Sequence, residues 1–164
     1  MPVGDVTSKE AGSGARYNDD KPPMHQVPVR YWSELWALQI GAGGLAPIGL
    51  NIAISALQRF QEGEDHAIRR TLCDRSALLS AMAVFQYGQE KYALYNWTKG
   101  MQWSIPTACA MRHIQAIVEG EKMDPESGLP HIGHVWCNLI MLDWFVDHYP
   151  EGDDRPHTRR HDKA

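Results

Sequence analysis

The sequence has few cysteines and no paired cysteine motif, which excludes two classes of small stabilised protein. Its three cysteines, Cys73, Cys109 and Cys137, form no C-x-x-C pair and are odd in number. This pattern argues against a disulfide framework and against a zinc site built from thiolates. We interpret all three as thiols that pack like small hydrophobic side chains.

Positive charge and long apolar runs are also scarce. The 16 Lys and Arg residues are outnumbered by 20 Asp and Glu residues, and no Lys/Arg block suggests a surface that follows a phosphate backbone. Every apolar run is interrupted well before the roughly 20 residues that a membrane span needs, and the N-terminus does not resemble a signal peptide. We therefore expect a cytoplasmic protein with no nucleic-acid partner and no membrane partner. A small anionic ligand stays compatible with this charge.

What is present is enough apolar content for one domain. A chain of 164 residues with 43% hydrophobic residues can bury a single core. The polar, aperiodic ends predict flexible tails at 1–15 and 150–164 around one helical domain at 16–149. Helical spacing recurs and no alternating run calls for a strand, so we predict an all-α fold. The helical patterns cover residues 29–40, 45–65, 66–97, 104–119 and 130–148.

The last helical pattern is apolar nearly all round. His131, His134 and Asn138 fall within an arc of roughly 60°, on a stripe that continues with apolar residues. The opposite face carries Trp136 and Trp144. Such a helix must be covered on both sides, by its own domain or by a second subunit, so we expect a homo-oligomer.

Ionisable residues gather just before that helix. The preceding helix carries Arg112 and His113, and the connection adds Glu121, Asp124 and Glu126. A guanidinium beside an imidazole suits an anion, and carboxylates suit Mg²⁺, whereas imidazole would also admit Mn²⁺ or Co²⁺. The constellation favours a site for metal and phosphate. The alternative is a set of interior polar groups that bond to one another and to the loop.

Other hydrolytic classes fit the sequence poorly. The spacing of His131 and His134 is not that of H-E-x-x-H, which argues against a zinc protease. A histidine–aspartate phosphohydrolase needs a His-Asp dipeptide on a helix, and the only one is His161-Asp162 in the polar C-terminal tail. Ser127 lies in E-S-G, which predicts a turn or a helix cap and not a nucleophile.

Three motifs in order carry a family resemblance. They are RYNDDKPPMHQVP, EKYALYNWTKGMQW and RHIQAIVEGEKMDPESGLPHIGHVWCN. Together they resemble the phage dATP/dGTP diphosphohydrolases, a group of MazG-like nucleotide pyrophosphohydrolases. The resemblance covers most of residues 14–148, and residues 37–78 are the part that does not match.

The resemblance implies an all-α, MazG-like helical bundle that is oligomeric. It also implies Mg²⁺-dependent hydrolysis of purine deoxynucleoside triphosphates, dGTP and dATP, to the monophosphate and pyrophosphate. In a phage with 2-aminoadenine DNA, such an enzyme supplies dGMP for 2-aminoadenine nucleotide synthesis. The alternatives are a triphosphate-releasing hydrolase and a helical interaction module without catalysis.

One departure from the wider MazG pattern leaves the metal ligands open. That pattern places E-x-x-E on one helix and E-x-x-D on the next. Here the second helix has His131-x-x-His134, and E-x-x-D occurs at Glu62/Asp65 and at Glu121/Asp124. The histidines could therefore bind metal, orient water or contact phosphate.

We expect water to attack the α-phosphorus with pyrophosphate leaving, and we assign residues to three roles. The expected metal ligands are Glu121, Asp124, Glu126, His131 and His134. The expected catalytic residues are Glu126, His113, His131 and His134. The expected substrate-binding residues are Arg16, Lys21, Lys91, Arg112 and Asn138 for phosphate or its surroundings, and Asn96 and Trp97 for the base or sugar. Packing is the alternative role for Trp97, and a solvated helix end is the alternative for Lys91.

Overall fold

The structure is a computed structural model. It describes residues 2–3, 7–14, 16–17, 20–43, 46–47, 49–72 and 75–156. For residues 2–3 and 16–17 it describes the backbone alone. Cys73 lies outside these ranges, whereas Cys109 and Cys137 are not in a disulfide and Cys137 is buried.

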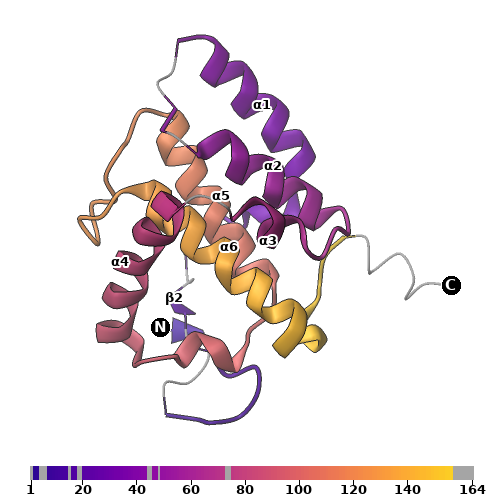
Figure 1. The fold of residues 1–164 in the computed structure, drawn as a ribbon, viewed down its shortest axis with the longest axis vertical. Coiled ribbons are helices and arrows are strands. Elements are labelled where there is room, and N and C mark those ends of the chain that lie inside the picture. The colour runs from indigo at the N-terminus through magenta and orange to yellow at the C-terminus, as the bar shows by residue number, and fades with distance from the viewer. Residues whose placement is uncertain are drawn as a thin grey trace, which may run out of the picture.

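Helices dominate the described residues, and the all-α prediction is confirmed (Figure 1). The six α-helices are α1 (Val29–Gly41), α2 (Leu50–Gln61), α3 (Ala67–Thr71), α4 (Arg75–Tyr92), α5 (Ser104–Val118) and α6 (His131–His148). Single 3₁₀ turns are η1 (Met24–Gln26), η2 (Asn96–Lys99) and η3 (Pro150–Gly152). The described strands are a two-residue antiparallel pair, β1 (Pro2–Val3) and β2 (Arg16–Tyr17). Among the described helices, none combines the length and the apolar content that a bilayer span requires.

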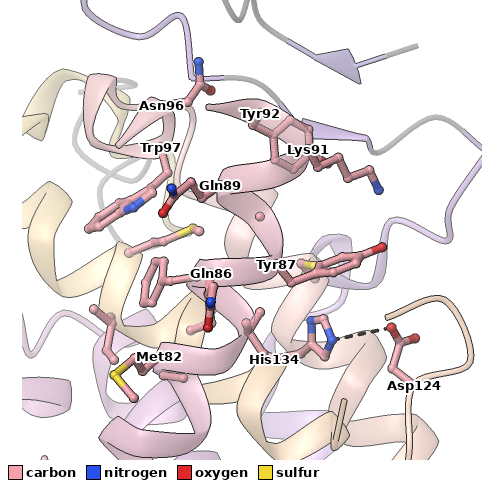
Figure 2. A pocket seen from close by; sticks show the side chains of 18 of the residues that line it. Met82, Gln86, Tyr87, Gln89, Lys91, Tyr92, Asn96, Trp97, Asp124 and His134 are labelled. Carbon is pink, nitrogen blue, oxygen red and sulfur yellow. Dashed lines mark ion pairs between the residues drawn. The ribbon is translucent and has the colours of Figure 1, made fainter. Parts of the chain in front are cut away.

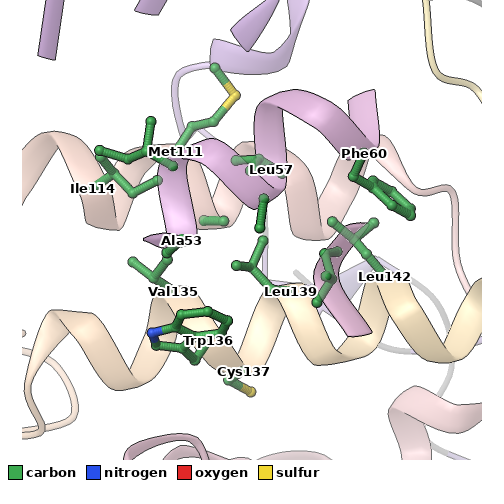
Figure 3. Packing of buried hydrophobic residues seen from close by; sticks show 14 of the residues in the cluster. Ala53, Leu57, Phe60, Met111, Ile114, Val135, Trp136, Cys137, Leu139 and Leu142 are labelled. Atoms are coloured by element: carbon green, nitrogen blue, oxygen red, sulfur yellow. The ribbon is translucent and has the colours of Figure 1, made fainter. Parts of the chain in front are cut away.

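Helix α6 runs through the middle of the molecule, between α5 and α4, with α2 and α3 also against it (Figure 1). It is buried on most sides, as its nearly continuous apolar sequence predicts. The core lies where α2, α5 and α6 meet, with Leu57, Ile114 and Leu139 at 0% exposure (Figure 3). This packing fixes the ends of α5 and α6, where the predicted site residues are.

Helix α4 packs on α6 through small residues. Ala77, Ala81 and Val84 are its buried residues. On the α6 side, a Cβ on Gly133 would lie 2.7 Å from the carbonyl oxygen of Ser80, so only glycine permits this approach. The larger apolar residues Leu78, Leu79 and Met82 are therefore left 47%, 48% and 60% exposed on the other face of α4.

The described parts of the two terminal segments contact the helical domain. Gly12 and Gly14 donate backbone hydrogen bonds to the carbonyl oxygens of Lys99 and Gly100. At the other end Arg155 is only 4% exposed. Its guanidinium lies 4.6 Å from the centroid of the Phe60 ring and 4.7 Å from that of Trp103.

One predicted helix is divided in the structure. The pattern at 66–97 is not one helix, because α3 ends at Thr71 and α4 begins at Arg75. Helix α5 begins at Ser104, as the pattern at 104–119 predicts, and the backbone N–H of Ser104 donates to Asp154 Oδ1 at 2.8 Å. The carboxylate thus takes the place of a local cap and ties the C-terminal segment to α5.

Candidate functional site

A cavity of about 940 Å³ lies beside α4 and is also lined by α5, α6 and the connection between them (Figure 2). Figure 2 shows Tyr87, His134 and Asp124 on one side of α4 and Trp97 on the other. The lining therefore has an ionisable part, made mainly by α5 and α6, and an aromatic part near η2. This volume is within the range that binds small ligands.

The connection between α5 and α6 is a tight turn. It is closed by the bridge between Met123 and Pro130 and by a bond from the Asp124 N–H to the Leu129 carbonyl oxygen at 2.8 Å. Gly128 has φ +71°, a left-handed conformation that glycine adopts at low cost. The turn therefore returns the chain directly to α6 and holds Asp124 beside the first turn of that helix.

Two histidines and a glutamate form one hydrogen-bonded chain. The Nδ1 atoms of His113 and His131 are 2.8 Å apart, and Nε2 of His131 lies 2.7 Å from Oε1 of Glu121. His131 is buried, whereas the Glu121 side chain is 53% exposed. An ionised carboxylate can only accept, so His131 donates from Nε2 and keeps a lone pair on Nδ1.

A second chain joins Asp124, Ser127 and His134. Ser127 donates to Oδ2 of Asp124 from its backbone N–H at 2.9 Å and from Oγ at 2.7 Å. Nε2 of His134 is 2.7 Å from the same Oγ and 3.4 Å from Oδ2 (Figure 2). Burial alone would raise the pKa of Asp124, but the two hydrogen bonds from Ser127, together with the neighbouring His134 and His113, lower that pKa overall.

The two hydrogen-bonded groups of side chains meet where the imidazole rings of His113 and His134 stack. The rings of His113 and His134 stack, with centroids 4.3 Å apart and an interplanar angle of 11°. One donor atom from each of His113, Asp124 and His131 lies within 4.8 Å of the others, which is compact enough to surround one metal ion. Two imidazoles and one carboxylate are a donor set that fits a divalent cation.

Cationic side chains border this cluster. Lys91 pairs with Glu126 at 2.6 Å, and both line the cavity together with Lys21 and Arg112. The hydrogen bond from Lys91 lowers the pKa of Glu126, against the opposing effect of burial. Burial would lower the pKa of Lys91, but the bond to Glu126 raises it, so the ammonium stays charged. The cavity thus offers positive charge to an anionic ligand.

Five more of the predicted site residues have the following positions in the structure. Glu121 is absent from the cavity lining and contacts His131. Asn138 is 1% exposed and donates to the His134 carbonyl oxygen at 2.7 Å, so it braces α6. Trp97 borders the cavity but packs against Phe85, Trp144 and Phe145, whereas Asn96 lines the cavity at 5% exposure. The backbone of Arg16 is in β2, and its side chain is outside the described residues.

Sequence reasoning missed much of the α4 side of the cavity. The unforeseen lining residues with polar or aromatic groups are Gln86, Tyr87, Gln89, Tyr92 and Tyr95. Ser127 was expected to shape the turn, and it also links Asp124 to His134. A usable signal was the recurrence of polar and aromatic residues along 86–95, which an ordinary core helix would not need.

The fold and the site together define an all-α protein with a histidine–carboxylate cluster that can hold a divalent cation beside a cationic cavity. The pattern of the family described as "dATP/dGTP diphosphohydrolase, N-terminal" matches residues 58–155, which is more than half of the chain. The chain belongs to this family. The match includes α3 to α6 and every cluster residue described above.

A curated relative agrees with this assignment. It is a dATP/dGTP diphosphohydrolase of Salmonella phage PMBT28, 29% identical over 72 residues, which are 44% of this chain and 24% of the relative. The aligned region is thus about a quarter of that relative. No solved structure matches this chain.

Proposed function

We propose that this protein hydrolyses purine deoxynucleoside triphosphates, dGTP and dATP, to the monophosphate and pyrophosphate, with a divalent cation such as Mg²⁺. The observation that carries the proposal is the convergence of three histidines and Asp124 with Lys91 and Arg112 on one cavity, all inside the stretch that matches the family; Lys21, from outside that stretch, lines the same cavity. The printed activity of the phage relative supports the choice of substrate.

The cationic side chains that line the cavity, Lys21, Lys91 and Arg112, would bind the triphosphate. Lys91 pairs with Glu126 of the turn at 2.6 Å, and Lys21 lines the same cavity; both charges lower the pKa of Glu126. Arg112 lines the same cavity and presents a planar group suited to phosphate oxygens. Phosphoryl transfer depends mainly on positioning and charge neutralisation, and these three residues supply both.

The imidazole cluster serves the attacking water. His113, His131 and Asp124 would hold the cation, which when bound neutralises phosphate charge and acidifies water. His134 lies beside them and is fixed through Nε2 by Ser127 and Asp124. A ring held in this way can orient a water molecule and accept its proton near neutral pH.

The aromatic part of the cavity serves the base and sugar. Tyr87 and Tyr92 offer aromatic faces, and Gln86 and Gln89 offer amide donors and acceptors (Figure 2). Asn96 adds a buried amide near η2. Purines have a large stacking face and several hydrogen-bonding edges, so this lining suits them. In a phage, the dGMP product would feed 2-aminoadenine nucleotide synthesis.

The test is to incubate the protein with dGTP, dATP or GTP and Mg²⁺ or Mn²⁺, and to identify all products by chromatography. We expect monophosphate and pyrophosphate in equal amounts. Nucleoside and triphosphate would instead identify a triphosphate-releasing hydrolase. No turnover of any purine nucleotide would contradict both enzymatic functions and favour a helical interaction module.

We also propose a homo-oligomer. The exposed apolar residues Leu78, Leu79 and Met82 on α4, with Trp144 at 38% exposure on α6, support this proposal. Light scattering after size exclusion should give a mass of at least two chains, each of 18.5 kDa. A mass of one chain at all concentrations would contradict it.

A further inference from the structure

We infer that His113, His131 and Asp124 form a site for a first-row transition-metal ion, Mn²⁺ or Co²⁺, in which Glu121 is not a ligand but positions His131. The inference deepens the proposed function by naming the metal class and the ligand set. It depends on contacts that exist without nucleotide, so it is tested by binding of the metal alone.

The contact of Glu121 with His131 is the first argument. Glu121 accepts from Nε2 of His131 at 2.7 Å, on the ring nitrogen that faces away from His113. Metal-binding histidines commonly donate their second N–H to a carboxylate, which fixes the tautomer and raises the basicity of the ligating nitrogen. Glu121 therefore leaves Nδ1 of His131 with the lone pair that a metal ion needs.

The separation of the two histidine nitrogens is the second argument. The two Nδ1 atoms are 2.8 Å apart, a contact that is favourable only if a proton or a cation lies between them. With metal–nitrogen bonds of about 2.1 Å, ligands at a right angle are about 3.0 Å apart and tetrahedral ligands about 3.4 Å apart. The observed separation is that of two nitrogens sharing one proton, so an ion bound here would take the place of that proton with a small increase in the separation.

The third ligand is held by its own partner. Ser127 donates twice to Oδ2 of Asp124, so the carboxylate has one fixed orientation next to the imidazoles. The donor set is then two nitrogens and one oxygen. Imidazole suits Mn²⁺ and Co²⁺ better than Mg²⁺, which prefers oxygen ligands and keeps its water. Three protein ligands also leave octahedral positions for water and phosphate.

Glu126 and His134 have other partners in this arrangement. Glu126 is paired with Lys91 at 2.6 Å, and Nε2 of His134 contacts Ser127 at 2.7 Å. Both residues remain at the cavity surface, where they are available to substrate. The inferred ligand set therefore keeps Asp124 and His131 of the five residues that the sequence suggested and adds His113.

The experiment is titration of the full chain with Co²⁺ alone, followed by visible absorption and by calorimetry, with Mn²⁺ and Mg²⁺ compared in the calorimeter. We expect one site per chain, weak visible bands of an octahedral complex, and Mg²⁺ affinity at least about 10-fold below that of Mn²⁺. His131→Ala should abolish the site. Glu121→Gln should keep the visible spectrum of an octahedral site and weaken binding roughly 10- to 100-fold.

Glu62→Gln is the matched control, because Glu62 occupies the first position of another E-x-x-D and pairs with Arg30 on the surface. It should bind Co²⁺ as the parent does. Parent affinity in His131→Ala, or in Glu121→Gln, would overturn the inference, as would stronger binding of Mg²⁺ than of Mn²⁺. Circular dichroism of each variant verifies that the helices form. If the site binds metal but dGTP yields other products, the proposed function is wrong and the metal site stands.

Discussion

Two copies of the E-x-x-D pattern, at Glu62/Asp65 and at Glu121/Asp124, have different partners. In the first copy, Glu62 pairs with Arg30 at 2.8 Å and Asp65 pairs with Arg155 at 2.6 Å. In the second copy, Glu121 bonds to an imidazole of His131, and Asp124 bonds to Ser127 beside His134. A single sequence pattern has thus produced two chemically different regions.

The two copies differ in whether the group paired with the carboxylate can give up its proton. A guanidinium keeps its proton at all ordinary pH values, so the carboxylates of the first copy are permanently neutralised. An imidazole can exchange its proton for a metal ion or pass it to water near neutral pH. The first copy therefore stabilises the fold, and the second is suited to chemistry. Spacing alone does not separate these roles, because the partners come from distant parts of the chain.

The largest expected effect separates the two copies directly. Asp124→Asn should lower dGTP turnover at least about 100-fold, because it removes a ligand of the cluster. The matched change Asp65→Asn should leave turnover within about threefold below the melting temperature, since Asp65 bonds to Arg155 and does not line the cavity. Steady-state rates at saturating metal measure both. Equal loss in the two variants would contradict the division.

The next effect tests the structural role of the first copy. Arg155 is buried, bonds to Asp65, Asp153 and the Phe60 carbonyl oxygen, and lies against the rings of Phe60 and Trp103. Burial would lower the pKa of its guanidinium, but the two carboxylates raise it, so it stays charged. Arg155→Ala should lower the free energy of unfolding by about 2–4 kcal/mol, because it leaves Asp153 and a carbonyl oxygen without their partner.

Denaturant unfolding measures this loss. Arg30→Ala is the control, because the pair of Arg30 with Glu62 is on the surface, and its effect should stay below about 1 kcal/mol. A loss in Arg155→Ala no larger than that of the control would show that the C-terminal segment does not stabilise the domain.

A smaller effect concerns Glu126. Because Glu126 pairs with Lys91 and both side chains are partly exposed, Glu126→Gln should change kcat/KM for dGTP by less than about fivefold and leave Co²⁺ affinity unchanged. If Glu126 is instead a ligand, as the sequence suggested, metal affinity and turnover should both fall by two orders of magnitude. Kinetics and calorimetry on the same preparation distinguish the two outcomes.

The smallest effect is a pH dependence at His25. Burial lowers the pKa of this imidazole, with Asp154 opposing and Arg112 reinforcing the shift. The unfolded chain therefore binds a proton on His25 more readily than the folded chain, so stability falls as pH drops through the ordinary histidine range near about 6.5. His25→Gln should lose less stability between pH 8 and pH 5.5 than the parent. An equal or greater loss in the variant would contradict this.

The fold class and half of the site could be predicted from local sequence. The apolar stripe of α6 predicts that His131 and His134 share its inward face, and the packing of α5 on α6 places His113 beside them. Both results depend on helical periodicity, which is a local property. The turn residues Asp124 and Ser127 were also recognisable from the local sequence of the connection between α5 and α6.

The remainder depended on contacts that local sequence does not record. On α4 the larger apolar residues would ordinarily face inward, but Gly133 allows close packing through Ala77 and Ala81, so the large residues face outward. This also turns Tyr87 toward the cavity. Arg155 was assigned to a flexible tail because its neighbours are polar, and its binding site is made by residues about 90 positions earlier.

The most direct test of the account is hydrolysis of dGTP in water enriched in ¹⁸O, with mass spectrometry of both products. The account predicts that the parent releases dGMP carrying one ¹⁸O and unlabelled pyrophosphate, since water attacks the α-phosphorus, and that Asp65→Asn does the same while Asp124→Asn releases neither. Label in pyrophosphate, release of triphosphate, or full activity of Asp124→Asn would contradict it.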